Sequence, residues 1–287
     1  MVADANAALD PGDAATRFVT DWRECLTGNL DAVIVATPPA THGPLLRELV
    51  AKKIPVLLEK PLCLDLNEAV SLQECVTQSN VPVLIDHTQL FHPAYEALTK
   101  KLHTAGPPKF IYAEGMALGP FRDDVSMMWD WAPHDIALSL SLCNTQPISV
   151  MAAGNEFAAS MQLTYQDGCI AWITNANVSS EKRRRLTIYC DDTMFVLDDR
   201  ADSSLMEYTF SFQHRPPHPP ALADGKPVSI PDGMPLTNVV ECFIDGITGG
   251  SQDAFGLSLA VNVVQVLTFA QRCIDTAHPQ QLDKILT

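Results

Sequence analysis

Three short apolar runs in the first third of the chain constrain its fold more than any other feature. They are DAVIVAT (residues 31–37), PVLLEK (55–60) and PVLIDH (82–87). Nearly continuous runs of this kind are typical of strands buried on both faces of a parallel sheet. Helix-length segments separate the runs, so the order strand, helix, strand, helix, strand predicts a parallel sheet with right-handed crossovers.

The two intervening segments begin with residues that favour helix starts. Thr41 precedes residues 42–53 as a candidate N-cap. Asp65 opens the second segment and is followed three positions later by Glu68, which resembles a capping box. We therefore predict one helix after each of the first two strands.

Chemically unusual residues follow all three predicted strands. Pro61 disfavours helical angles at Lys60, so this lysine is predicted to extend along the strand direction. Taken singly, each such residue is more often structural than functional. Because the fold brings three strand ends to one edge, where parallel sheets bind ligands, we predict a crevice there. Its candidate residues are Pro38, Pro39, His42, Glu59, Lys60, His87 and His92.

A second candidate group lies in MMWDWAPHDIAL, residues 127–138, where Asp130 and His134 are four positions apart. In a helix these side chains share one face. A carboxylate beside a histidine can orient the ring and stabilise its charged form, as a general base requires. The alternative is an Asp N-cap near a surface histidine, which Pro133 in a first helical turn supports. A metal site is a third possibility, without a third ligand at suitable spacing, and we predict no metal.

The charge balance limits the possible partners. The sequence has 34 acidic and 19 basic residues, a formal charge of −15, which repels both nucleic acid and an anionic membrane. We expect neither as a partner. The densest basic run, EKRRRLT (181–187), is either a solvated turn entering a strand, the commoner case, or an anion site. Eight scattered cysteines fit reduced thiols, and MVADANAALD lacks a signal-peptide pattern, so we expect a cytoplasmic protein.

The order of VIVATPPATH, VLLEKPL, LIDHTQLFHPAY and WDWAPHDIAL resembles the Gfo/Idh/MocA family of NAD(P)-dependent oxidoreductases. The resemblance implies an α/β protein with two parts. Residues 1–92 would form an incomplete Rossmann-like parallel-sheet domain. Residues 93–287 would form an α/β domain whose open, mostly antiparallel sheet covers the active site and mediates oligomers, a dimer or tetramer. The implied activity is hydride transfer between a nicotinamide cofactor and a hydroxyl or carbonyl of a sugar, nucleotide sugar or cyclitol.

The resemblance also implies roles for individual residues. Lys60 matches the lysine beside the nicotinamide and the reacting carbon, His134 the acid/base histidine, and Asp130 the acidic residue one helical turn before it. The implied cofactor-binding residues are Asp4, Thr37, Pro38, His42, Glu59, Lys60 and His87. The candidate substrate residues are Trp131 and, in the segment GPFRDDV, Arg122 and Asp123, for which a surface loop is the alternative.

The sequence also departs from the family pattern. The family normally opens with a strand and a G-x-G-x-x-G turn that binds the pyrophosphate, whereas this sequence contains no G-x-G. MVAD resembles the end of the family's second strand, with Asp4 in the place of the acidic residue that favours NAD over NADP. Ala137 stands where an aspartate is common, with Asp135 as a candidate partial substitute.

These departures leave two functions open. The chain is expected to begin inside the Rossmann fold, short of roughly the first strand, turn and helix of a ~30-residue unit. Binding of NAD or NADP would then be weak or lost, although the three catalytic candidates are present. The alternative to an oxidoreductase is a catalytically silent family member that acts as a binding or assembly protein with a degenerate dinucleotide site.

Overall fold

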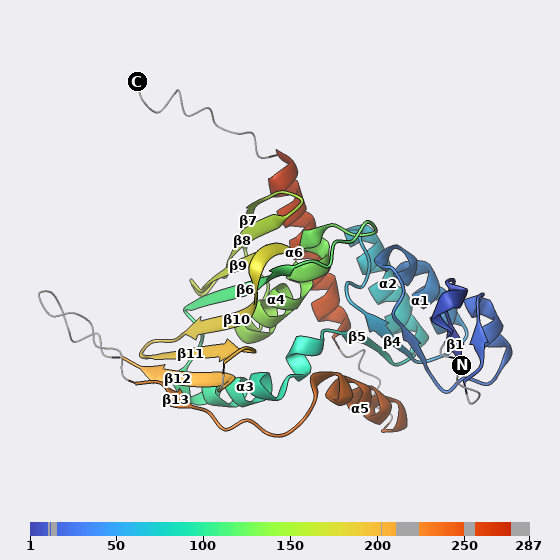
Figure 1. Cartoon of the computed structure of the whole chain (residues 1–287), viewed down its shortest axis with the longest axis horizontal. Coiled ribbons are helices and arrows are strands. Elements are labelled where there is room, and N and C mark those ends of the chain that lie inside the picture. Colours follow the sequence, from blue (N-terminus) through green and yellow to red (C-terminus); the bar gives the residue numbers. More distant parts are fainter. Residues whose placement is uncertain (11, 13–15, 202, 211–223, 250–255, 277–287) are drawn as a thin grey trace, which may run out of the picture.

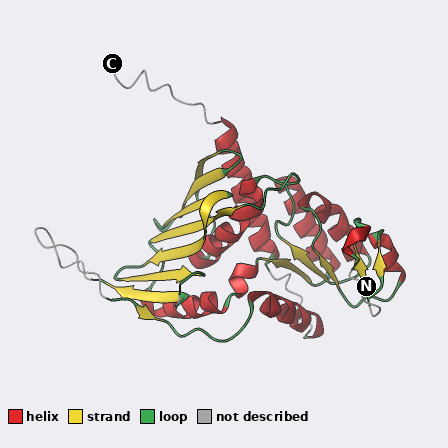
Figure 2. Ribbon diagram, viewed as in Figure 1, coloured by secondary structure: helices red, strands yellow, loops and turns green. Residues whose placement is uncertain are grey.

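The computed structural model describes residues 1–10, 12, 16–201, 203–210, 224–249 and 256–276. A group of short parallel strands with two helices lies at one end of the molecule, and a large sheet lies at the other (Figure 1; Figure 2). Two helices come from the C-terminal part of the chain: α5 (Pro235–Thr248) packs on the parallel strands, and α6 (Leu257–Thr276) contacts both groups.

Three of the parallel strands are those predicted from the sequence. They are β3 (Val33–Val35), β4 (Val56–Glu59) and β5 (Val83–Asp86), paired in that order. The helices α1 (His42–Ala51) and α2 (Leu66–Ser79) connect them. The predicted strand and helix order is therefore confirmed.

The two predicted helix caps have different outcomes. The Asp65 side chain accepts a hydrogen bond of 2.9 Å from the Glu68 backbone N–H, so this cap is confirmed. Thr41 occupies the predicted N-cap position, but its side chain makes no capping bond, so the prediction is confirmed in position only. The reason is local: the Thr41 hydroxyl donates instead to the Pro38 carbonyl at 2.7 Å, within the turn that contains the 3-10 helix η3 (Pro39–Thr41).

Burial on both faces holds for only two of the three strands. One face of the sheet packs against α1 and α2, and Leu57 and Leu84 on the other face pack against Val239 and Phe243 of α5. Ile34 shares that second face, because it pairs in register with Leu57, yet it is 61% exposed. The prediction of two-sided burial is thus wrong for β3, which α5 does not cover.

The first residues form a separate small unit. Strands β1 (Val2–Ala3) and β2 (Phe18–Val19) pair in parallel as a two-stranded sheet. Short 3-10 helices follow each strand, η1 (Ala7–Leu9) after β1 and η2 (Trp22–Thr27) after β2. Together with β3 to β5 this unit gives the predicted Rossmann-like parallel arrangement.

The large sheet has eight strands in the order β13-β12-β11-β10-β6-β9-β8-β7. Only the β6–β9 pair is parallel, so the prediction of an open, mostly antiparallel sheet is confirmed. The strands are β6 (Phe110–Leu118), β7 (Ser149–Gly154), β8 (Ala158–Thr164), β9 (Ile170–Ala176), β10 (Val178–Tyr189), β11 (Thr193–Asp198), β12 (Leu205–Thr209) and β13 (Lys226–Pro227).

Helices cover one face of this sheet and leave the other open. The covering helices are α3 (Pro93–Ala105), α4 (Met127–Cys143) and α6, and the 3-10 helix η4 (Thr88–Phe91) precedes α3. Among the described residues, α6 alone is long and apolar enough to cross a membrane. It packs against α4, α2, β5 and β7, with Val264 and Leu267 fully buried, as expected of a core helix.

The basic run lies inside a strand. Residues 178–189 are extended throughout as β10, so the interpretation of residues 181–187 as a turn is wrong. The alternation of the strand places Leu186 and Ile188 in the core and leaves the three arginines before them partly buried. The division of the chain at residue 92 stays a prediction, although α5, far beyond that point, packs on the parallel sheet.

Candidate active site

The end of β4 and the first turn of α4 meet through Lys60 and Asp130. The Lys60 ammonium donates to the Asp130 backbone carbonyl at 2.6 Å and to its Oδ1 at 3.0 Å. Both side chains are largely buried, with 12% and 16% of their surface exposed. In Figure 1, α4 lies between the large sheet and the parallel strands. The pair therefore joins the crevice predicted at the strand ends to the group predicted on the helix.

Arg122 reaches the same carboxylate from the loop before α4. Its Nη1 lies 3.5 Å from Asp130 Oδ1, while its Nη2 pairs with Asp124 at 2.6 Å. The pKa of Arg122 is raised, chiefly by the bond to Asp124. Asp123 is exposed on this loop. The structure thus brings Arg122 to the candidate site through Asp130 and leaves Asp123 on the surface beside it.

His134 lies one turn further along α4 and is half-buried. Its Nδ1 is enclosed and has no hydrogen-bond partner among the described residues, whereas Nε2 is not one of the enclosed, unpartnered atoms. Burial, followed by the charges of Lys60 and Arg184, lowers the pKa of His134 well below 6.5. The ring is therefore neutral near pH 7, which is the form that can accept a proton.

The expected pairing of Asp130 with His134 is wrong. Among the described residues, Asp130 is bonded to Lys60 and Arg122, and no hydrogen bond joins it to the histidine. The surface-histidine alternative is wrong too, because the Nδ1 side of the ring is enclosed. A cation within reach on the facing domain attracts the carboxylate more strongly than a neutral imidazole does.

Two of the predicted cofactor residues lie beneath the groove. His42 is fully buried, with Nδ1 2.8 Å from the Pro61 carbonyl oxygen and Nε2 2.8 Å from that of Thr37. It thereby ties together the loops that follow β3 and β4. Burial lowers the pKa of His42, and the two carbonyls partly offset the effect. His87 is 2% exposed, and neither of its ring nitrogens has a hydrogen-bond partner within the part of the chain that the structure describes.

Carboxylates surround the lysine on the strand side. Glu59 and Asp86 lie opposite each other at the ends of β4 and β5. Burial raises the pKa of both, and Asp86 raises that of Glu59 further, while Lys60 lowers both. The Thr88 hydroxyl donates to Asp86 Oδ1 at 2.7 Å. Lys60 is thus the cation that balances a buried acidic cluster.

The remaining predicted groove residues are accessible. Thr37 and Pro38 are exposed after β3, and the Thr37 hydroxyl lies 2.6 Å from that of Thr41. Asp4, after β1, is half-buried and accepts a bond from the Asn6 backbone at 2.8 Å. Among the residues described, no group of three or more side chains is arranged to hold a metal.

Sequence reasoning missed several residues that pack against α4. The Arg184 guanidinium lies 6.0 Å from the centre of the Trp131 ring and 3.5 Å from Asp135 Oδ1. Trp131, a predicted substrate residue, is half-buried between the cleft and the sheet. The basic run at residues 181–187 was the sequence feature that could have indicated Arg184. Only the strand register shows which arginine of that run faces α4.

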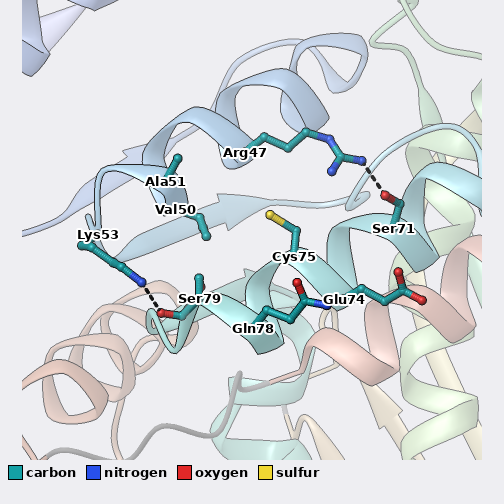
Figure 3. Close-up of a pocket in the computed structure, with 9 residues that line it drawn as sticks. All are labelled: Arg47, Val50, Ala51, Lys53, Ser71, Glu74, Cys75, Gln78 and Ser79. Atoms are coloured by element: carbon teal, nitrogen blue, oxygen red, sulfur yellow. Dashed lines mark hydrogen bonds between the residues drawn. The ribbon is translucent and has the colours of Figure 1, made fainter.

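A hollow of about 380 Å³ between α1 and α2 is separate from this site (Figure 3). Arg47 donates to the Ser71 hydroxyl at 3.0 Å, and Lys53 donates to the Ser79 carbonyl at 2.7 Å. Its two cations therefore already have partners, and none of the residues around Lys60 lines it.

Comparison with known proteins agrees with this architecture. Residues 4–87 match the Gfo/Idh/MocA oxidoreductase family, described as having an NAD-binding Rossmann fold. A crystal structure from Magnetospirillum magnetotacticum MS-1, classed as an oxidoreductase, is 33% identical, with a TM-score of 0.79 over 88% of this chain and 84% of that one.

Two curated relatives are named as dehydrogenases. UDP-N-acetylglucosamine 3-dehydrogenase of Acidithiobacillus ferrooxidans is 28% identical over 184 residues, 61% of this chain and 58% of that protein. Inositol 2-dehydrogenase 4 of Saccharopolyspora erythraea is 38% identical over 112 residues, 37% of this chain and 33% of that protein. The matched region thus spans less than two thirds of each curated relative.

Proposed function

The chain belongs to the Gfo/Idh/MocA family of oxidoreductases, and we propose that it transfers a hydride between a nicotinamide cofactor and a hydroxyl-bearing carbon of a sugar, nucleotide sugar or cyclitol. The observation that carries the proposal is the Lys60–Asp130 contact, which places a cation at the strand ends one helical turn from a neutral histidine. A sugar-like substrate is supported by the named activities of both curated relatives.

The side chains have complementary roles in this reaction. His134 accepts the hydroxyl proton at Nε2 and returns it in the reverse direction. The Lys60 ammonium, fixed by Asp130, stabilises negative charge on the substrate oxygen as the carbonyl forms. A nicotinamide held beside Glu59 and Lys60 would supply the hydride-transfer chemistry. Arg122 and Trp131 are the proposed substrate contacts, with Asp123 on the adjoining loop.

The residues present fit the nicotinamide end of a dinucleotide better than its phosphates. Thr37 and Pro38 offer an exposed surface beside Glu59 and Lys60, and Asp4 offers a carboxylate for the adenosine ribose at the other end of the dinucleotide. His42 and His87 contribute from below by shaping the loops. The pyrophosphate is normally held by a glycine turn, which the sequence lacks. The second candidate is a binding or assembly protein without redox catalysis.

A turnover assay separates the two candidates. The purified chain is incubated with NAD⁺ or NADP⁺ and a panel of UDP-N-acetylglucosamine, UDP-glucose and inositols, and nicotinamide reduction is followed by absorbance. Turnover that is lost in Lys60→Met and His134→Gln supports the oxidoreductase. Binding of a panel member without any turnover supports the silent binding protein.

We propose in addition that the chain forms a dimer or tetramer through the open face of the large sheet. That face carries Trp172, Met151 and Leu118, which are 50%, 58% and 75% exposed. Exposed large apolar side chains on an uncovered sheet face support an interaction site there. A cytoplasmic location is supported by the eight free cysteines, and the charge of −15 supports the absence of nucleic-acid and membrane partners.

A further inference from the structure

Three residues from three neighbouring strands lie in one row across the large sheet. Gly115 of β6 is in register with Asn175 of β9 on one side and with Arg184 of β10 on the other. Residues directly opposite one another project on the same face of a sheet. This face is the one that α4 covers, because both Asn175 and Arg184 contact Asp135 of that helix.

The central position of the row has no room for a side chain. A Cβ atom on Gly115 would lie 2.6 Å from Asn175 Nδ2 and 3.0 Å from Asp135 Oδ2. The next atom that it would meet, at 3.6 Å, belongs to the Trp131 ring. Glycine is therefore needed here for space, and its absent side chain lets Asp135 reach down from α4 to the strands.

Asp135 is held from both sides of this gap. Its Oδ2 accepts a hydrogen bond of 2.7 Å from Asn175 Nδ2, and its Oδ1 lies 3.5 Å from Arg184 Nη1. The carboxylate is 2% exposed, and Asn175 is fully buried. Burial raises the pKa of Asp135, while Arg184 and Asn175 oppose that rise. Burying a carboxylate is costly even when it is paired, so this arrangement calls for a role beyond holding a helix to a sheet.

Asn175 and Arg184 together form a clamp on Asp135, which is the residue next to His134. Fixing the side chain of Asp135 fixes the height and rotation of this helical turn, and with them the direction of the neighbouring imidazole. His134 has no hydrogen bond at Nδ1 to orient its own ring. The orientation of His134 therefore depends on the backbone that carries it and on the side chains packed around the ring.

We propose that Asp135, clamped by Asn175 and Arg184 over the gap at Gly115, is a positioning residue that aims His134 at the substrate hydroxyl. The proposal rests on the proposed function for its kinetic consequence, but its structural part concerns the imidazole alone. Asp135, the candidate partial substitute for an aspartate at position 137, is therefore directed at the sheet and nearly fully buried.

The first test compares two identical substitutions. Gly115→Ala forces the clamp apart, whereas Gly28→Ala places its methyl group in open space with no atom within 4 Å. In Gly115→Ala, kcat should fall by about 10- to 100-fold, the effect of displacing a catalytic group by about 1 Å, with KM and NADH affinity nearly unchanged. Gly28→Ala should match the wild type. A folded Gly115→Ala protein with normal kcat would overturn the proposal.

The second test does not need turnover. The ring resonances of His134, assigned by their loss in His134→Gln, are followed by NMR through a pH titration. They should shift in Asp135→Asn and more strongly in Asp135→Ala, because Asn keeps the shape and one acceptor oxygen. They should not shift in Gly28→Ala. If they stay unchanged in both Asp135 variants, Asp135 does not position His134.

The two arms separate the possible failures. If the wild-type chain turns over no member of the substrate panel, the proposed function fails, and the NMR arm still decides the positioning role. If Gly115→Ala does not fold, the nearly isosteric Asp135→Asn takes its place in the kinetic arm. A loss of thermal stability without a change in kcat or in the His134 resonances would show that the clamp has only a structural role and would overturn the proposal.

Discussion

The Lys60 ammonium is bonded to both the backbone carbonyl and the carboxylate of Asp130, at 2.6 and 3.0 Å, although 70 positions separate the two residues. Two bonds to one residue fix the lysine more firmly than a single ion pair would. Because Lys60 follows β4 and Asp130 lies in the first turn of α4, the contact holds the parallel sheet and the helix in one arrangement.

Removing the ammonium should abolish most of the activity. Lys60→Met keeps the length of the side chain but not its charge, so kcat should fall at least about 100-fold, the usual loss when one stabilising donor is removed. Lys100→Met is the matched control, since Lys100 is exposed and pairs only with Glu96 on its own helix. Steady-state kinetics of both variants test this prediction, and normal turnover by Lys60→Met would contradict it.

Replacing the proposed base should be comparably damaging. His134→Gln should lower kcat by roughly 10²- to 10⁴-fold, the range expected for a positioned acid/base group. His103→Gln, on the exposed end of α3, should leave turnover unchanged. Because the pKa of His134 is lowered well below 6.5, activity should persist as the pH falls through 6.5 and decline only below it. An acid limb at or above pH 6.5 in kcat/KM would argue against His134 as the base.

His87 should make the fold sensitive to acid. Burial, followed by the charge of Lys60, lowers the pKa of His87 from 6.5 to about 4. In the unfolded chain the His87 ring is therefore protonated below pH 6.5, whereas in the folded chain it is protonated only below about pH 4. The free energy of unfolding is unaffected by this group above pH 6.5. It decreases by about 3 kcal/mol as the pH falls from 6.5 to 4.

Denaturant unfolding at a series of pH values measures this effect. In His87→Gln, which does not titrate, the free energy of unfolding should decline less steeply between pH 6.5 and 4. His103→Gln should retain the wild-type slope. Equal slopes for wild type and His87→Gln would show that the buried imidazole does not govern the acid response.

The chain as given should bind NADH and NADPH only weakly. The glycine turn that normally supplies backbone donors to the pyrophosphate is absent from the sequence, and the N-termini of α1 and α2 lie after other strands. Nicotinamide fluorescence or calorimetry measures the affinity, with Asp4→Ala expected to reduce what binding remains. Micromolar or tighter binding would show that another segment holds the phosphates and would strengthen the case for a dehydrogenase.

The open sheet face should control assembly. Trp172→Glu places a charge among exposed apolar side chains, so it should convert an oligomer into a monomer. Phe269→Glu on α6 is the control, since Phe269 is 40% exposed on a different element. Light scattering after size-exclusion chromatography measures the mass. A wild-type monomer, or a Trp172→Glu oligomer, would contradict the proposed interface.

Local patterns in the sequence were sufficient to predict much of the first domain. The apolar runs predicted β3, β4 and β5, and Asp65 predicted the start of α2. The spacing of Asp130 and His134 placed both on one helix. These features depend on residues a few positions apart, whose backbone preferences and periodicity act before any tertiary contact forms.

The partners of these residues were decided only by the tertiary structure. Asp130 was expected beside His134 but lies against Lys60, and His42 is buried between two carbonyl oxygens. Neither outcome follows from local spacing, because each depends on how separate elements pack. The exposure of Ile34 likewise depends on tertiary packing, because α5 covers Leu57 and Leu84 but does not extend over β3.

The row of Asn175, Gly115 and Arg184 is the clearest case of this difference. The sequence by itself predicted that His134 and Asp135 lie on a helix, but it did not predict β6, and residues 181–187 were interpreted as a turn entering a strand. Only the parallel pairing of β6 with β9, and the antiparallel pairing with β10, placed a glycine between an amide and a guanidinium beneath that carboxylate. Strand register depends on the fit of all facing side chains at once, and shifting it by one residue turns every side chain to the opposite face.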